Sequence, residues 1–104
     1  MTTEEQLTTV LAERVMGWKS APGRYIKSER SWLPQWRFDP LCRVENAFEL
    51  LGASGATFIL KRVRAKVFRA EVRINGRVGV AADDNEARAI TIAVARAFGI
   101  EMTP

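Results

Sequence analysis

The side chains that most often carry out catalysis or bind metals are scarce in this sequence. Its 104 residues include no histidine and a single cysteine, Cys42. Histidine is the usual general base near neutral pH and the commonest metal ligand, and zinc sites are built mainly from cysteine and histidine. We therefore expect no zinc or haem centre, no histidine-dependent catalysis and no internal disulfide.

One group of carboxylates could still bind a metal. Asp83, Asp84 and Glu86 lie close together in the sequence, and such oxygen ligands suit Mg²⁺. Asp83 and Glu86 also fit the capping box of a helix, where the macrodipole favours acidic side chains, and we favour this interpretation. Because the chain has no phosphate-binding loop, dinucleotide fingerprint or nucleophile motif, the sequence predicts no enzyme, no catalytic residue, no metal site and no cofactor.

A run of basic side chains is the strongest candidate for a binding site. Residues 61–77 contain seven basic residues and one acidic residue, a local net charge of +6, whereas the whole chain carries +4. Such a patch favours an acidic partner, either nucleic acid phosphates or an acidic protein surface. It could equally be a solvated sheet face whose charges deter edge-to-edge aggregation. If it binds a partner, one continuous solvent-facing surface should carry Arg62, Arg64, Lys66, Arg69, Arg73 and Arg77.

Two tryptophans, Trp32 and Trp36, are further candidate partner-binding residues. Tryptophan is enriched in interface hot spots, and it can stack on nucleic acid bases. Aromatic side chains at this density more often fill the core of a small domain, and we favour core packing here. Trp18, on the apolar stripe of a predicted helix, is expected in the core.

The N-terminal third is predicted to contain one helix and an irregular segment. Apolar side chains recur at spacings of three and four between residues 7 and 18, which predicts an amphipathic helix over residues 3–18. Either Thr2 with Glu5 or Thr3 with Gln6 would form its capping box. Residues 19–38 contain prolines, a glycine and several aromatics, so we expect an ordered excursion with at most a short strand.

A second helix is predicted over residues 39–52. Asp39 would be its N-cap, with Pro40 in the first turn, although a start nearer Arg43 fits equally well. Gly52 would end it.

From residue 57 the apolar period changes to two, which predicts strands. We expect strands over residues 57–63 and 67–74 and a third after Asn75–Gly76, because both central residues of a type I′ hairpin turn need positive φ. The last helix, residues 83–99, should cover one face of this sheet. The side chains predicted to be buried under that helix are Phe68, Val72, Val78 and Val80, with Arg69 and Arg73 on the opposite face.

The predicted elements make an α+β protein: an N-terminal helix, a second helix, a three-stranded antiparallel sheet and a C-terminal helix packed on the sheet. The length suits a single domain, 1–104, in which residues 1–38 form the N-terminal helix with the aromatic-rich segment, and residues 39–104 an αβββα unit. No apolar run approaches the ~20 residues that span a bilayer. Glu4 and Glu5 stand where a signal peptide needs positive charge, so we expect a cytoplasmic protein without a membrane partner.

Most of the chain resembles the phage ABA sandwich domain family. The resemblance rests on LAERVMGW (11–18), Trp32, FDPL (38–41), AFELL (47–51) and the alanine-rich final helix AITIAVARAFG. Cys42 departs from the family, in which Ser or Thr usually caps this helix. The resemblance implies an accessory protein of a phage or prophage in a bacterial host, and it carries no catalytic or ligand-binding residues.

Residues 44–99 also resemble the double-stranded-RNA-binding domain in the order helix, three strands, helix. VFRAEVRING and the alanine-rich last helix carry this resemblance. That family has basic residues at the start of the last helix, where they meet phosphates. Here Asp83, Asp84 and Glu86 would repel a phosphate, so the resemblance supports the topology more than RNA binding.

The sequence therefore predicts a non-enzymatic, phage-encoded accessory protein that binds a host macromolecule, with inhibition of a host defence system as one version. The partner would be a host protein or complex with an acidic surface. The alternative is a nucleic-acid-binding module that uses the basic run from Lys61 to Arg77. The oligomeric state stays open, a homodimer included.

Overall fold

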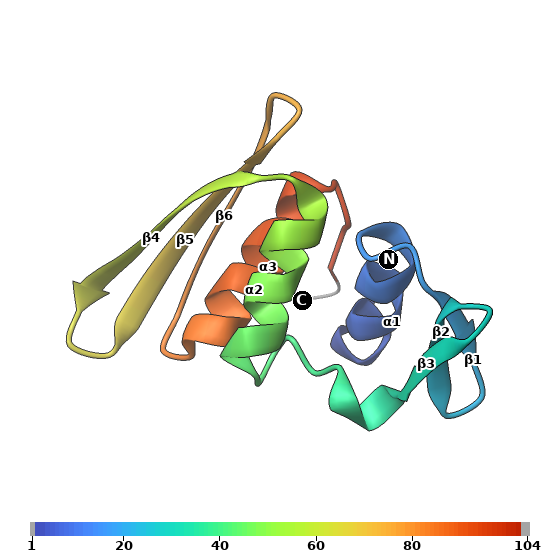
Figure 1. Ribbon diagram of the computed structural model, residues 1–104. Coiled ribbons are helices and arrows are strands. Elements are labelled where there is room, and N and C mark those ends of the chain that lie inside the picture. The colour runs from blue at the N-terminus through green and yellow to red at the C-terminus, as the bar shows by residue number, and fades with distance from the viewer. Residues whose placement is uncertain (1, 103–104) are drawn as a thin grey trace.

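The computed structural model describes residues 2–102 and shows the predicted α+β fold with one sheet more than expected (Figure 1). The three helices lie between two three-stranded antiparallel sheets, and the C-terminal helix packs on the second sheet. The elements in chain order are α1 (Glu4–Arg14), β1 (Lys19–Ala21), β2 (Arg24–Ser28), β3 (Ser31–Pro34), the 3₁₀ helix η1 (Gln35–Arg37), α2 (Val44–Ser54), β4 (Thr57–Arg64), β5 (Val67–Ile74), β6 (Arg77–Asp83) and α3 (Glu86–Ala97).

Helix α1 starts as one of the two predicted capping boxes requires. The Thr3 side chain accepts a hydrogen bond from the Gln6 backbone, and the Gln6 side chain accepts one from the Thr3 backbone. The helix ends at Arg14, earlier than the predicted residue 18. Trp18 therefore lies outside the helix, yet it is buried as predicted.

The expectation of at most one short strand in residues 19–38 was wrong. The segment forms the sheet β1–β2–β3, in which Ser20 pairs with Tyr25 and Tyr25 with Leu33. The strands are short, and most of their side chains are exposed, so the sequence lacks the apolar alternation that predicts a strand. Tyr25 holds the sheet to the core through Trp18 and Phe38, whose ring centroids both lie 6.0 Å from its own.

Helix α2 begins at Val44, so the Asp39–Pro40 start was wrong and the start near Arg43 was right. Asp39 begins a separate turn, in which its carbonyl accepts from the backbone of Arg43 at 2.8 Å. The helix runs past the predicted stop at Gly52 and ends at Ser54, followed by the C-cap Gly55, which has the left-handed φ of 67°.

The second sheet has the order β4–β5–β6. Asn75 and Gly76 form the predicted hairpin with φ of 50° and 80°. The prediction that Val78 and Val80 are buried was wrong, because the two-residue turn pairs Ile74 with Arg77. This register places Val78 beside Arg73 and Val80 beside Glu71, on the face away from the helices.

Small residues of β6 occupy the face that the valines were expected to fill. Gly79 pairs with Val72 and Ala81 with Ala70, and all four are buried. Helix α3 lies directly on them, with Ala89, Ala93 and Ala97 buried. Small side chains on both elements let the helix approach the sheet backbone closely.

Helix α3 begins after Asn85, whose side chain accepts from the backbone N–H of Arg88 at 3.3 Å. Asp83 is therefore not the N-cap that the sequence indicated. It is the last residue of β6, and its carboxylate accepts from the backbone N–H of Asn85 at 3.0 Å.

Candidate functional site

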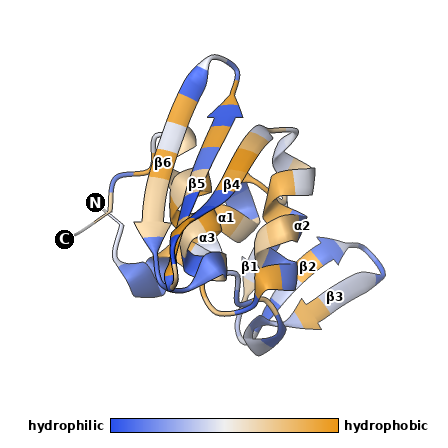
Figure 2. Cartoon of the chain, turned by 90° about the vertical axis from the view of Figure 1, so that its left-hand side faces the viewer, coloured by the Kyte–Doolittle hydropathy of each residue, from blue (hydrophilic) through white to orange (hydrophobic). Residues whose placement is uncertain are grey.

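The face of the β4–β6 sheet turned away from the helices carries much of the predicted basic run. Lys61 lies opposite Arg69, and Arg64 lies opposite Val67 on the same face after a bulge. Arg73 lies opposite Thr57, and Arg69 and Arg73 are exposed as the alternation predicts. We call Lys61, Arg64, Arg69 and Arg73 the outer basic face; Figure 2 shows the three strands side by side, with hydrophobic and hydrophilic residues alternating along β5.

The outer basic face also presents apolar side chains. Ile59 is 51% exposed and Val78 47% exposed. A hollow of about 170 Å³ opens beside Ile59, with Thr57, Glu71 and Arg73 among its lining residues. Glu71 lies 3.5 Å from the Arg73 guanidinium, so it partly balances that one charge. The face thus combines exposed aliphatic groups with unbalanced positive charge, a composition that suits protein contacts.

The expectation of one continuous basic surface was wrong for two arginines. Arg62 pairs with Phe68 on the helix side of the sheet, and its guanidinium lies 5.5 Å from the centre of the Phe68 ring. Arg77 pairs with Ile74, also on the helix side, and donates to the carbonyl of Phe98 at 3.5 Å. Arg62 follows the alternation of Phe58 and Leu60, and the two-residue hairpin fixes the side of Arg77. Lys66, in the turn that joins β4 to β5, is exposed at one end of the outer basic face.

Trp32 and Trp36 are 58% and 68% exposed, so core packing was the wrong interpretation for both. Arg24 lies over the Trp32 ring at 5.7 Å, and Arg37 over the Trp36 ring at 5.5 Å. Both tryptophans belong to the small sheet and the 3₁₀ helix that follows it, at the far end of the molecule from β4–β6 (Figure 1). The structure therefore separates the two tryptophans from the basic residues.

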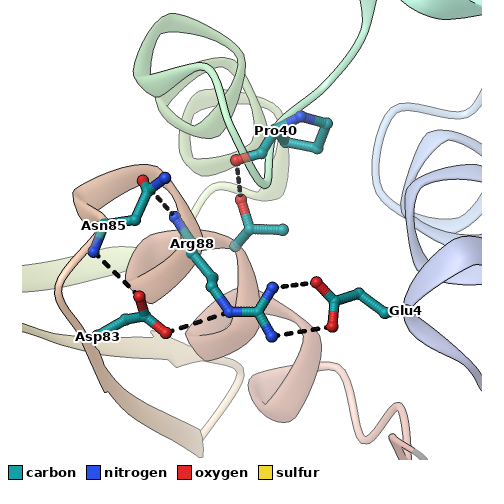
Figure 3. Close-up of polar contacts among 6 residues, drawn as sticks. Glu4, Pro40, Asp83, Asn85 and Arg88 are labelled. Carbon is teal, nitrogen blue, oxygen red and sulfur yellow. Dashed lines mark hydrogen bonds and ion pairs between the residues drawn. The ribbon is translucent and has the colours of Figure 1, made fainter.

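Two acidic side chains near α3, Asp83 and Glu4, are engaged in structural contacts. Figure 3 shows Arg88 between Glu4 and Asp83, with its Nε atom 3.1 Å from the Asp83 carboxylate and its Nη2 atom 2.9 Å from Glu4. Burial raises the pKa of Asp83, but the hydrogen bond from the Asn85 backbone N–H and the charge and hydrogen bond of Arg88 outweigh it, and the net shift is downward. No cluster of metal-ligating side chains occurs within residues 2–102.

Cys42 is exposed and has no activating neighbour. The negative charge of Asp39, and a hydrogen bond to it, raise the pKa of the Cys42 thiol. A raised pKa disfavours the thiolate, which is the nucleophilic form. Cys42 is therefore a poor nucleophile.

Sequence reasoning missed the exposed apolar residues of β4. Phe58 and Ile59 are 46% and 51% exposed, and Val63 is 49% exposed. The signal was present, because Phe58, Ile59 and Leu60 are consecutive and a strand cannot bury consecutive residues on one face.

Comparison with solved structures shows a similarity at the level of the fold. The fold is similar to that of a Bacillus cereus phage protein. The crystal structure of that protein, from strain ATCC 14579, superposes with a TM-score of 0.74 over 99% of this chain and 94% of the other, at 16% sequence identity. The phage resemblance seen in the sequence is thereby confirmed for the fold.

No family model matches the chain. No curated protein matches it either. Within residues 2–102, none of the helices is long and apolar enough to cross a membrane.

Proposed function

We propose that this protein is a non-enzymatic, phage-encoded accessory protein that binds an acidic surface of a host protein through the outer basic face. The observation that carries the proposal is the composition of that face. Lys61, Arg69 and Arg73 surround Ile59 and Val78, and all five are exposed on the face of the sheet that no helix covers. Arginine beside aliphatic groups is typical of protein interfaces, and a positive patch steers an acidic partner toward it.

The phage origin is supported by the shared fold with the Bacillus cereus phage protein and by the family resemblance in the sequence. Fold alone does not imply function, so the role rests on the site. Binding that blocks a host defence complex in the bacterial cytoplasm is the version we favour, because such a role needs surface complementarity and no catalytic group.

The proposal that the protein is not an enzyme is supported by the surroundings of two side chains that could otherwise react, Asp83 and Cys42. Asp83 is bound by Arg88 and Asn85, and the pKa of the Cys42 thiol is raised. Neither residue is available as a general base or nucleophile at neutral pH.

A protein partner is favoured over nucleic acid by two features. The residues that precede and start α3 are Asp83, Asp84 and Glu86, where the RNA-binding fold needs positive charge. The outer basic face also carries Ile59, Val78 and Val80 between its cations, and these side chains cannot stack on bases as aromatic rings do.

The test compares two double charge reversals. The variant R69E/R73E alters the outer basic face, and the matched control K19E/R30E alters exposed residues of the small-sheet segment. Each lowers the formal net charge from +4 to 0, because each reversal subtracts two. Immobilised proteins are incubated with bacterial lysate, with and without nuclease, and crosslinked partners are identified.

We expect a nuclease-resistant protein partner that wild type and K19E/R30E capture and that R69E/R73E loses. Capture that disappears with nuclease and falls steeply with salt would instead establish the nucleic acid function. Equal capture by all three proteins would contradict any role of the outer basic face.

A further inference from the structure

Strand β4 forms an uncovered edge of the sheet. It pairs with β5 on one side, and within residues 2–102 nothing else forms a hydrogen bond with residues 57–64. Seven of its eight residues are exposed, and Leu60 is half-buried. The other edge is better protected, because Arg96 of α3 donates to the Val80 carbonyl of β6 at 2.5 Å. An exposed edge presents unpaired backbone N–H and C=O groups that can pair with another strand.

Apolar side chains flank this edge on both faces. Ile59 and Val63 lie on the outer side, 51% and 49% exposed. On the helix side, Phe58 meets Phe48 of α2 edge to face, with ring centroids 6.2 Å apart, and both rings remain about half exposed. A strand added beside β4 would cover apolar surface on both of its faces, as added strands do when alternate side chains enter pockets.

The positive charge of β4 is confined to the second half of the strand. Residues 57–60 are Thr-Phe-Ile-Leu, and residues 61–64 are Lys-Arg-Val-Arg. Between residues 57 and 70 there is no carboxylate, while Lys66 and Arg69 add to the positive charge. A second copy of this chain paired antiparallel along β4 would bring together six cations and no anion, and it would place the cations of each copy opposite residues 57–60 of the other, which cannot neutralise them. Acidic side chains opposite Lys61, Arg62 and Arg64 would neutralise them.

We propose that the free edge of β4 receives an extended peptide segment, apolar opposite Phe58, Ile59 and Leu60 and acidic opposite Lys61, Arg62 and Arg64. The inference rests on the proposed function and assigns its mode of recognition: main-chain pairing supplies affinity, and the divided side-chain pattern supplies direction and specificity. The segment adds a fourth strand to the sheet.

The probe is a synthetic peptide of eight residues, the length of β4, with the sequence EVEEVIVT and blocked ends. Its first half is acidic and its second half is β-branched, so that it complements β4 in the antiparallel direction. Titration into ¹⁵N-labelled full-length protein should shift the backbone amides of residues 57–64 and leave those of residues 77–83 unchanged. The charge-reversed peptide KVKKVIVT should cause no shift.

Two further controls separate strand pairing from simple charge attraction. Two peptides carry N-methyl groups on alternate residues, one on the odd and one on the even positions. Only one of the two alternating sets of backbone N–H groups can face β4. The peptide methylated on that set should not bind, and the other peptide should bind. The variant K61E/R62E should bind the unmodified peptide about tenfold more weakly than K19E/R30E, since it loses two exposed ion pairs with the peptide.

Equal binding of both N-methylated peptides would overturn strand addition, as would the absence of shifts in residues 57–64. A wild-type dimer whose interface contains β4 would also overturn it, in favour of a second copy. The proposed function is tested separately: if R69E/R73E loses its host partner while K61E/R62E retains it and no peptide binds, the outer basic face is functional and the edge is not.

Discussion

Gly79 of β6 lies directly against the Ala93 carbonyl of α3. A Cβ atom on Gly79 would collide with that oxygen and would lie 2.5 Å from the backbone nitrogen of Ala97. Both partners are backbone atoms, so neither can rotate away. This contact sets the distance between α3 and the sheet that carries the outer basic face.

The substitution Gly79→Ala should therefore destabilise the protein. We expect a loss of about 1–3 kcal/mol in the free energy of unfolding, the usual range for overpacking a rigid contact. The matched control is Gly52→Ala on an exposed turn of α2, where nothing lies within 4 Å of the new Cβ. It should stabilise the helix by roughly 0.5–1 kcal/mol. Urea denaturation measures both, and a neutral Gly79→Ala would contradict the close approach.

The three tryptophans should differ sharply in their contribution to stability. Trp18 packs its ring 5.0 Å from that of Phe38 and is buried, so Trp18→Ala should cost about 3–5 kcal/mol. Trp32→Ala and Trp36→Ala remove exposed rings and should each change stability by about 0.5 kcal/mol or less. Thermal unfolding followed by circular dichroism distinguishes the two classes. A large loss for Trp36→Ala would show that its ring is buried.

Thr91 should be required for its hydroxyl group. It is fully buried in α3, and its Oγ1 atom donates to the Pro40 carbonyl at 2.6 Å, which ties the turn before α2 to α3. Thr91→Val keeps the shape but leaves that carbonyl without its donor, at a cost of about 1–3 kcal/mol. Thr91→Ser retains the hydroxyl and should lose less. If the valine variant is the more stable of the two, the hydrogen bond is not what holds this junction.

The free energy of unfolding should decrease in acid, because Arg88 pairs with two carboxylates, those of Glu4 and Asp83. The hydrogen bond from Arg88 lowers the pKa of Glu4 against a small opposing effect of burial, and the pKa of Asp83 is lowered as well. A carboxylate with a lowered folded-state pKa contributes stability above its ordinary value of about 4, and that stability is lost as the pH falls through the folded-state pKa.

Arg88→Met removes the cation that both carboxylates share and should make stability less dependent on pH below about 5. Urea unfolding between pH 7 and pH 3 measures this difference against wild type. Glu4 and the Arg88 side chain are substantially exposed, so the effect should be modest at neutral pH and smaller still in high salt. Parallel pH profiles for the two proteins would show that other groups control acid unfolding.

Local patterns in the sequence determined much of the second half of the chain. The Asn75–Gly76 turn and the limits of β5 follow directly from turn chemistry and period-two alternation, because both depend on neighbouring residues alone. The alternation also placed Arg69 and Arg73 outward. The capping pair Thr3 and Gln6 is local in the same sense.

Tertiary structure decided which face of the second sheet the helices cover and which aromatic residues are buried. Val78 is exposed because the hairpin parity places Gly79 under α3, and the alanines of α3 leave no space for a valine there. Arg62 lies on the helix side because it alternates in step with Phe58 and Leu60 before the bulge, and Arg77 lies there because the turn pairs it with Ile74. Trp18 is buried and Trp36 exposed because Tyr25 and Phe38 come from distant positions to cover the first and not the second. Which face a helix covers and which rings are enclosed depend on contacts between separate elements, and local spacing carries no information about those contacts.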